Sequence, residues 1–198
     1  MLFRSPTDVI PIMPVTRRIA LIFCGLAEAG LGNVAAALNH LQAAEGEMER
    51  QSVHLDWYWR LALEWGMVDV LIAKGDQSTA LSRAERLCDL AAQTDERTWQ
   101  ALGWEALARA ALSCGEAAKA RDAAEKALAA CEGMQVPLAE WRVHATCAIT
   151  FAALGDNHRT GTHARLGAAA RKRLAESLPE GHPVRLTFER RSGPLCEA

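Results

Sequence analysis

The sequence predicts an all-α protein of four antiparallel helix pairs, and three observations support this. Half of the 198 residues are apolar, and alanine, the strongest helix former, accounts for 38 residues against four phenylalanines and one tyrosine. Four glycines, Gly32, Gly75, Gly115 and Gly155, follow one another at separations of 43, 40 and 40 residues. Small or apolar residues follow each glycine at constant offsets of five, nine and twelve positions. A repeated helix–turn–helix unit explains all three observations.

The glycine register predicts where each helix begins and ends. The first helices of the pairs are expected over residues 15–31, 55–74, 96–114 and 137–154, and the second over 33–50, 76–93, 116–132 and 157–178. Glycine in a left-handed conformation ends a helix, and Asp76 and Asp156, which follow Gly75 and Gly155, suit the cap of the next helix. Pro137 suits the first turn of a helix.

The residues at the constant offsets lie on one face of each second helix, because their +4, +3 spacing matches the helical period. The four sets are Ala37/Leu41/Ala44, Ala80/Ala84/Leu87, Ala120/Ala124/Ala127 and Thr160/Ala164/Gly167. We expect this face to pack against the partner helix, with Ala120 and its equivalents at the closest approach.

The repeat is expected to form one domain over residues 15–178. Residues 1–14 hold Pro6, Pro11 and Pro14 and are expected to be an extended N-terminal segment. Residues 179–198, with three further prolines, are expected to be a short C-terminal helix and a frayed tail.

The net charge and the cysteine pattern indicate which kinds of partner and which cellular compartment to expect. The net charge of −2 provides no overall field for nucleic acid or membrane, although residues 159–191 carry +5. The six cysteines form no C-x-x-C pair, so we expect buried, reduced thiols and a cytoplasmic location. Export is the alternative, because residues 16–29 combine Arg17-Arg18, an apolar run and an A-x-A sequence, as signal peptides do. Cleavage there would remove the first helix.

No catalytic motif is present in the sequence, and we expect neither an enzyme nor a cofactor or metal site. Gly25-x4-Gly30 lacks the Lys and Ser/Thr that complete a phosphate-binding loop. His158 and His163 point about 140° apart on a helix, and the other histidines stand alone. G-x-S-x-G and H-E-x-x-H are both missing.

The Gly-x4-Ala register, with Trp104 eleven residues before Gly115, resembles the tetratricopeptide repeat (TPR), here lengthened from about 34 to about 40 residues. The resemblance covers residues 15–178 and implies an α-solenoid. Segments such as Asp56-Trp57-Tyr58-Trp59-Arg60 and Val136-Pro137-Leu138-Ala139-Glu140-Trp141 are similar to the helical tails of bacterial signalling proteins. In those proteins a DNA-binding, kinase or cyclase module and an ATPase precede the tail. Glu189-Arg190-Arg191 departs from the apolar ending of such tails.

The resemblance also implies a concave groove lined by the first helices. On this chain the groove positions include five residues: Trp65, Asp69, Glu105, Arg109 and Arg142. Trp65 beside mixed charges suggests an anchor for a partner, whereas Trp59, Trp99 and Trp104 are expected to pack between units. An ordinary solvated inner face is the alternative.

The sequence therefore predicts a non-catalytic protein-interaction scaffold, the regulatory tail of a signalling system. Its partner is expected to be a protein or peptide, such as an ATPase or kinase module. The alternative function is a small-molecule sensor of a signalling ATPase or transcriptional regulator.

Overall fold

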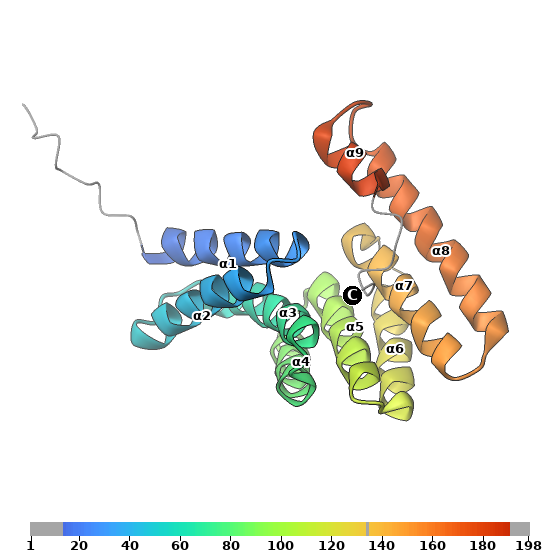
Figure 1. Ribbon diagram of the computed structural model, residues 1–198, viewed down its shortest axis with the longest axis horizontal. Helices are drawn as coiled ribbons and strands as arrows, with labels where there is room; N and C mark the ends of the chain where they lie inside the picture. Colours follow the sequence, from blue (N-terminus) through green and yellow to red (C-terminus); the bar gives the residue numbers. More distant parts are fainter. Residues whose placement is uncertain (1–13, 134, 191–198) are drawn as a thin grey trace, which may run out of the picture.

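The computed structural model describes residues 14–133 and 135–190, and these residues form helices joined by turns, without a strand (Figure 1). In chain order the helices are α1 (Pro14–Gly30), α2 (Val34–Arg50), α3 (Asp56–Lys74), α4 (Gln77–Ala92), α5 (Arg97–Ser113), α6 (Ala117–Cys131), α7 (Pro137–Ala153), α8 (Asn157–Glu176) and α9 (Pro183–Arg190). The predicted all-α class is confirmed. All eight expected repeat helices are present, with ends within two residues of the predicted positions.

The two ends of the chain agree with the prediction only in part. Pro14 begins α1 and is not part of an extended segment, because proline suits the first helical turn. The rest of that segment, residues 1–13, and the predicted frayed tail at 191–198 lie outside the described residues. The expected short C-terminal helix is α9, which packs on α8.

The predicted glycines end their helices in the left-handed conformation. Gly32, Gly75, Gly115 and Gly155 have φ values of 84°, 83°, 76° and 76°. After Gly75 the backbone N–H of Asp76 donates to the carbonyl of Leu71, which satisfies one of the last free acceptors of α3. The carboxylates of Asp76 and Asp156 accept from the N–H groups of Thr79 and Arg159, as expected of N-caps.

Helix pairs pack in sequence order, as Figure 1 shows from α1 in blue to α8 in orange. Each second helix contacts its own partner and the next first helix: α2 packs on α3, α4 on α5, and α6 on α7. The first helices α1, α3, α5 and α7 also contact one another in turn. Within the described part of the chain, the second helices do not contact one another.

The small residues of the register form the core between helices. The first three sets are buried throughout, with Ala37, Ala80 and Ala120 all at 0% exposure. In the fourth set Gly167 is buried but Ala164 is exposed, because among the described helices only α7 and the short α9 contact α8. The resulting helix contacts are close: a Cβ atom on Gly167 would lie 3.3 Å from the backbone nitrogen of Ala145.

The stretch that resembles a signal peptide forms α1 and contributes to the core. Arg18 and Ile22 are buried, and a Cβ atom on Gly25 would lie 2.7 Å from Cγ of Leu41. No helix among the described residues combines the length and the apolar character needed to cross a bilayer.

Replacing Ala120 by leucine tests the packing register. Ala120 is fully buried in the first turn of α6, so the larger side chain should overpack the contact with α5 and lower the unfolding free energy by about 1–3 kcal/mol. Urea unfolding followed by circular dichroism measures this change. Ala118→Leu, on the exposed side of the same turn, should change stability by less than about 0.5 kcal/mol. Equal stabilities of the two variants would contradict the register.

Candidate functional site

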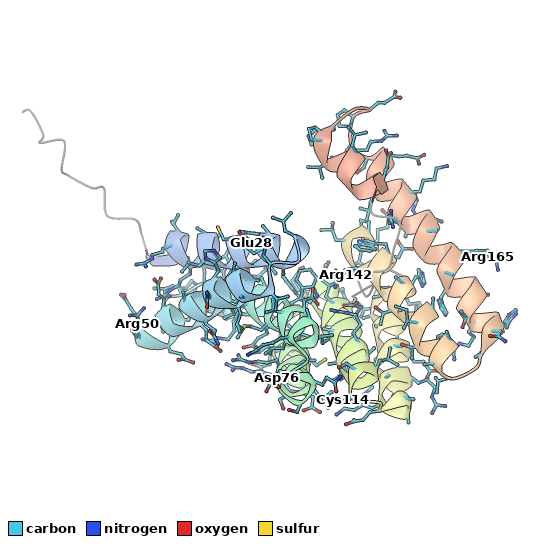
Figure 2. The ribbon with its side chains drawn as sticks, viewed as in Figure 1. Glu28, Arg50, Asp76, Cys114, Arg142 and Arg165 are labelled. Atoms are coloured by element: carbon cyan, nitrogen blue, oxygen red, sulfur yellow. The ribbon has the colours of Figure 1, made fainter. Side chains whose placement is uncertain are left out.

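The structure brings the five residues predicted to line the groove into one group. Trp65 and Asp69 lie four residues apart on α3, Glu105 and Arg109 lie four apart on α5, and Arg142 comes from α7. Side chains four residues apart share a helix face, and α5 packs between α3 and α7. Figure 2 labels Arg142 where α5 and α7 adjoin. We call these five residues the inter-helix cluster.

Two carboxylates and two guanidinium groups of the inter-helix cluster neutralise each other. Arg109 Nη2 lies 2.6 Å from Asp69 Oδ1, and its Nε lies 2.7 Å from Glu105 Oε1. Arg142 is further away, with Nη2 3.5 Å from Asp69 Oδ2 and Nε 3.7 Å from Glu105 Oε2. The Thr146 hydroxyl donates to Glu105 Oε1 at 2.8 Å. These contacts connect three consecutive first helices.

Most of the inter-helix cluster is buried, which differs from an open groove lined by exposed charges. Glu105, Arg142 and Arg109 are 2%, 6% and 8% exposed, whereas the Asp69 side chain is 26% exposed. Burial alone would raise the pKa of Glu105, but the charges of Arg109 and Arg142 and the hydrogen bonds from Arg109 and Thr146 outweigh it and lower the pKa. The Glu105 carboxylate therefore stays ionised, and it is a poor proton acceptor for acid–base chemistry.

The Trp65 side chain packs against one aromatic ring outside the inter-helix cluster and one guanidinium group within it. Its indole is half-buried, meets Trp99 edge to face at 6.4 Å between ring centroids, and lies 4.6 Å from the guanidinium carbon of Arg142. Trp65 and Trp99, for which the sequence predicted separate roles, therefore touch each other.

Three hydrogen-bond donors of this group lack an acceptor among the described residues: Trp65 Nε1 and both Nε and Nη2 of Arg142. An unsatisfied buried donor costs about 1–3 kcal/mol. Because the guanidinium lies over the indole ring, these donors are close together. All three donor atoms are themselves buried, although Trp65 as a whole is only half-buried.

Two further buried ion networks were not predicted. Arg18 Nη1 lies 2.7 Å from both carboxylate oxygens of Asp56, and its Nη2 donates to the carbonyls of Glu47 and Gln51. Glu64, at 0% exposure, accepts a hydrogen bond from Arg83 Nη1 at 3.1 Å. In the sequence, a single charged residue within an apolar stretch could have indicated a buried ion pair, as for Glu64 in Leu61-Ala-Leu-Glu-Trp-Gly-Met-Val68. Periodicity alone does not name the partner of such a charge.

The histidines require a correction, because His144 does not stand alone. Its Nδ1 lies 3.1 Å from Nδ1 of His163, and the rings stack at 5.2 Å, joining α7 to α8. His163 also stacks on Phe151. Burial is the main cause that lowers the pKa of both imidazoles. The charge of Glu140 opposes this shift at His144, whereas Arg173 and Arg159 act in the same direction as burial. In the described ranges no three His, Cys, Asp or Glu side chains are grouped to hold a metal ion.

Comparison with known proteins adds no family assignment. The sequence matches no protein family, and a search of curated proteins finds none with significant similarity.

Glu105→Gln tests the electrostatic role of the cluster. The variant keeps the shape of the side chain but leaves two buried guanidinium groups with Asp69 alone, so the unfolding free energy should fall by about 3–5 kcal/mol. Glu125→Gln is the matched control, because Glu125 pairs with Arg159 at the surface, and should cost less than about 1 kcal/mol. Similar losses in urea unfolding would show that the buried network does not stabilise the fold.

The histidine pair predicts how stability depends on pH. A lowered folded-state pKa means that the unfolded chain binds protons more readily, so stability should decrease as the pH falls below about 6.5. His163→Phe keeps a ring against Phe151 and should weaken this dependence between about pH 7.5 and 5.5. His158→Phe, exposed on the same helix, should leave it unchanged. An unchanged slope in His163→Phe would contradict the assignment.

Proposed function

We propose that this protein is a non-catalytic interaction module of the tetratricopeptide type, an α-solenoid over residues 15–178 that binds a protein or peptide partner. The repeated left-handed glycines and the packing order of the helices support the repeat architecture. First helices contact one another whereas second helices do not, so the first helices occupy the more closely spaced, inner side of a curved row. Repeat proteins of this kind use their inner surface to bind partners.

One observation carries the binding proposal: Trp65 and Arg142 hold three buried donors without an acceptor, and Arg142 lies 3.5 Å from the partly exposed Asp69. Once the side chains around Asp69 and Trp65 move aside, a carbonyl or carboxylate oxygen from a partner would supply the missing acceptor and recover the cost of the unpaired donors. An extended peptide offers such oxygens at regular intervals, and tryptophan and arginine are the residue types that most often dominate binding energy. We therefore infer that a peptide segment lies across α3, α5 and α7.

The partner is expected to belong to a signalling system. The repeat register and the segments around Trp57 and Trp141 resemble regulatory tails, and such a tail would act on an ATPase or kinase module. The net charge of −2 gives no support to nucleic acid as the ligand.

Trp65→Phe tests the inner surface while it keeps an aromatic ring at this position and removes less volume than a change to alanine. Peptides selected from a random display library against the parent protein should bind the variant roughly three- to tenfold more weakly, because phenylalanine keeps the ring packing but loses the indole N–H. Isothermal calorimetry measures the affinity. A large-to-small change such as Trp65→Ala or Trp99→Ala is less informative, since both rings pack together and either truncation removes core contacts.

Trp59→Phe is the matched control. Trp59 is also half-buried on α3 with an unbonded Nε1, but it packs against Phe23 of α1, away from the inter-helix cluster. Equal affinities of the two variants would contradict the proposed surface. Selection that yields no peptide, together with a metabolite that raises the Tm of the parent but not of Trp65→Phe, would favour the sensor instead.

A further inference from the structure

A second surface feature lies where α3 begins and α4 leads into α5. A hollow of about 590 Å³ is lined by residues from all three segments: Trp57, Leu90, Gln93, Thr94, Asp95 and Glu96. Trp57 is in the first turn of α3, two turns before Trp65. The inter-helix cluster contributes no residue to this lining.

Trp57 offers an open aromatic face to the hollow. It is 52% exposed, and its described ring contact is an edge-to-face one with the adjacent Tyr58 at 5.7 Å. Elsewhere the chain places cations over its tryptophans: Lys126 lies 4.4 Å from the centre of Trp104, and Arg142 covers Trp65. No described cation covers Trp57.

Two carboxylates at the hollow have no charged partner in the described part of the chain. Neither Asp95 nor Glu96 forms an ion pair or a side-chain hydrogen bond with any residue the structure describes. Glu96 is the N-cap residue of α5, yet its side chain does not cap the helix. The adjacent Arg97 does not compensate them, because its guanidinium donates to the carbonyls of Ala129, Ala130 and Glu132 at the end of α6.

The helix dipole accounts for only part of this arrangement. Acidic residues at the start of α5 interact favourably with its N-terminus, by about 0.3–1 kcal/mol each. That interaction requires neither a hollow nor a half-exposed tryptophan beside the carboxylates. The combination of an aromatic face and uncompensated negative charge is the chemistry that recognises an organic cation.

We propose that this hollow binds an arginine side chain from a basic peptide segment. The guanidinium stacks on Trp57 as Arg142 does on Trp65, and it donates hydrogen bonds to the carboxylates of Asp95 and Glu96. Leu90, which packs on the core, receives the apolar stem of the side chain. The site is separate from the inter-helix cluster, so it stands or fails independently of peptide binding across α3, α5 and α7.

The test measures fluorescence anisotropy of a labelled peptide of alternating glycine and arginine with the full chain at low ionic strength. The parent should bind, and added salt should weaken binding. Trp57→Ala should weaken it by roughly three- to thirtyfold, and Asp95→Asn/Glu96→Gln by at least tenfold. The same peptide with citrulline in place of arginine should not bind, because citrulline keeps the shape and loses the charge.

Glu49→Gln/Glu180→Gln is the matched charge control, since it removes two exposed carboxylates that form no described ion pair. This variant should bind like the parent, and circular dichroism should show that all variants remain folded under the conditions of the binding assay. A parent that fails to bind, or a control that loses as much affinity as Asp95→Asn/Glu96→Gln, would overturn the proposal. Binding of N-acetyl-arginine amide as tight as that of the peptide would overturn the assignment to a peptide segment.

Discussion

The left-handed glycine turn is the constraint on which the rest of this structure depends. Each of the four turns reverses the chain within two or three residues, so two helices must run back side by side. Neither helix of such a pair can bury all its apolar residues on its partner alone, and each pair therefore packs on the next. Alanine and glycine at the crossings then decide how close the helices come, as the full burial of Ala37, Ala80 and Ala120 shows.

Close packing of the first helices has an electrostatic consequence. Charged residues on α3, α5 and α7 are buried together, and their ion pairs offset the desolvation cost of burying them. The geometry of neutralisation is uneven: Arg109 sits within 2.7 Å of both of its carboxylates, whereas Arg142 stays at 3.5 Å or beyond. The guanidinium group on α5 is thus closely paired with carboxylates, whereas the guanidinium group on α7 is paired less closely.

The sequence predicted the local structure better than the environment of the side chains. A glycine turn or an Asp cap is determined by a few adjacent residues. These local signals predicted the ends of every repeat helix to within two residues. The same register brought Trp65, Asp69, Glu105, Arg109 and Arg142 to one face. It did not show that most of them are buried, because burial depends on the distance between neighbouring helices and on how long side chains fold across it. The pairing of His144 with His163 was missed for a similar reason: the two residues meet only once α7 and α8 lie side by side.

The uncovered face of α8 bears on how such a molecule behaves at high concentration. In a protein built of similar stacked units, an exposed apolar face could pack against the complementary face of a second molecule. Here the last long helix presents Arg165, Lys172 and Arg173 to solvent, interspersed with alanines such as Ala164 and Ala168. A second molecule packed on this face would take Arg165 out of water, together with the surface ion pairs of Lys172 with Glu176 and of Arg173 with Glu140. The charges on the solvent-exposed face of α8 therefore disfavour the stacking of a second molecule on this face.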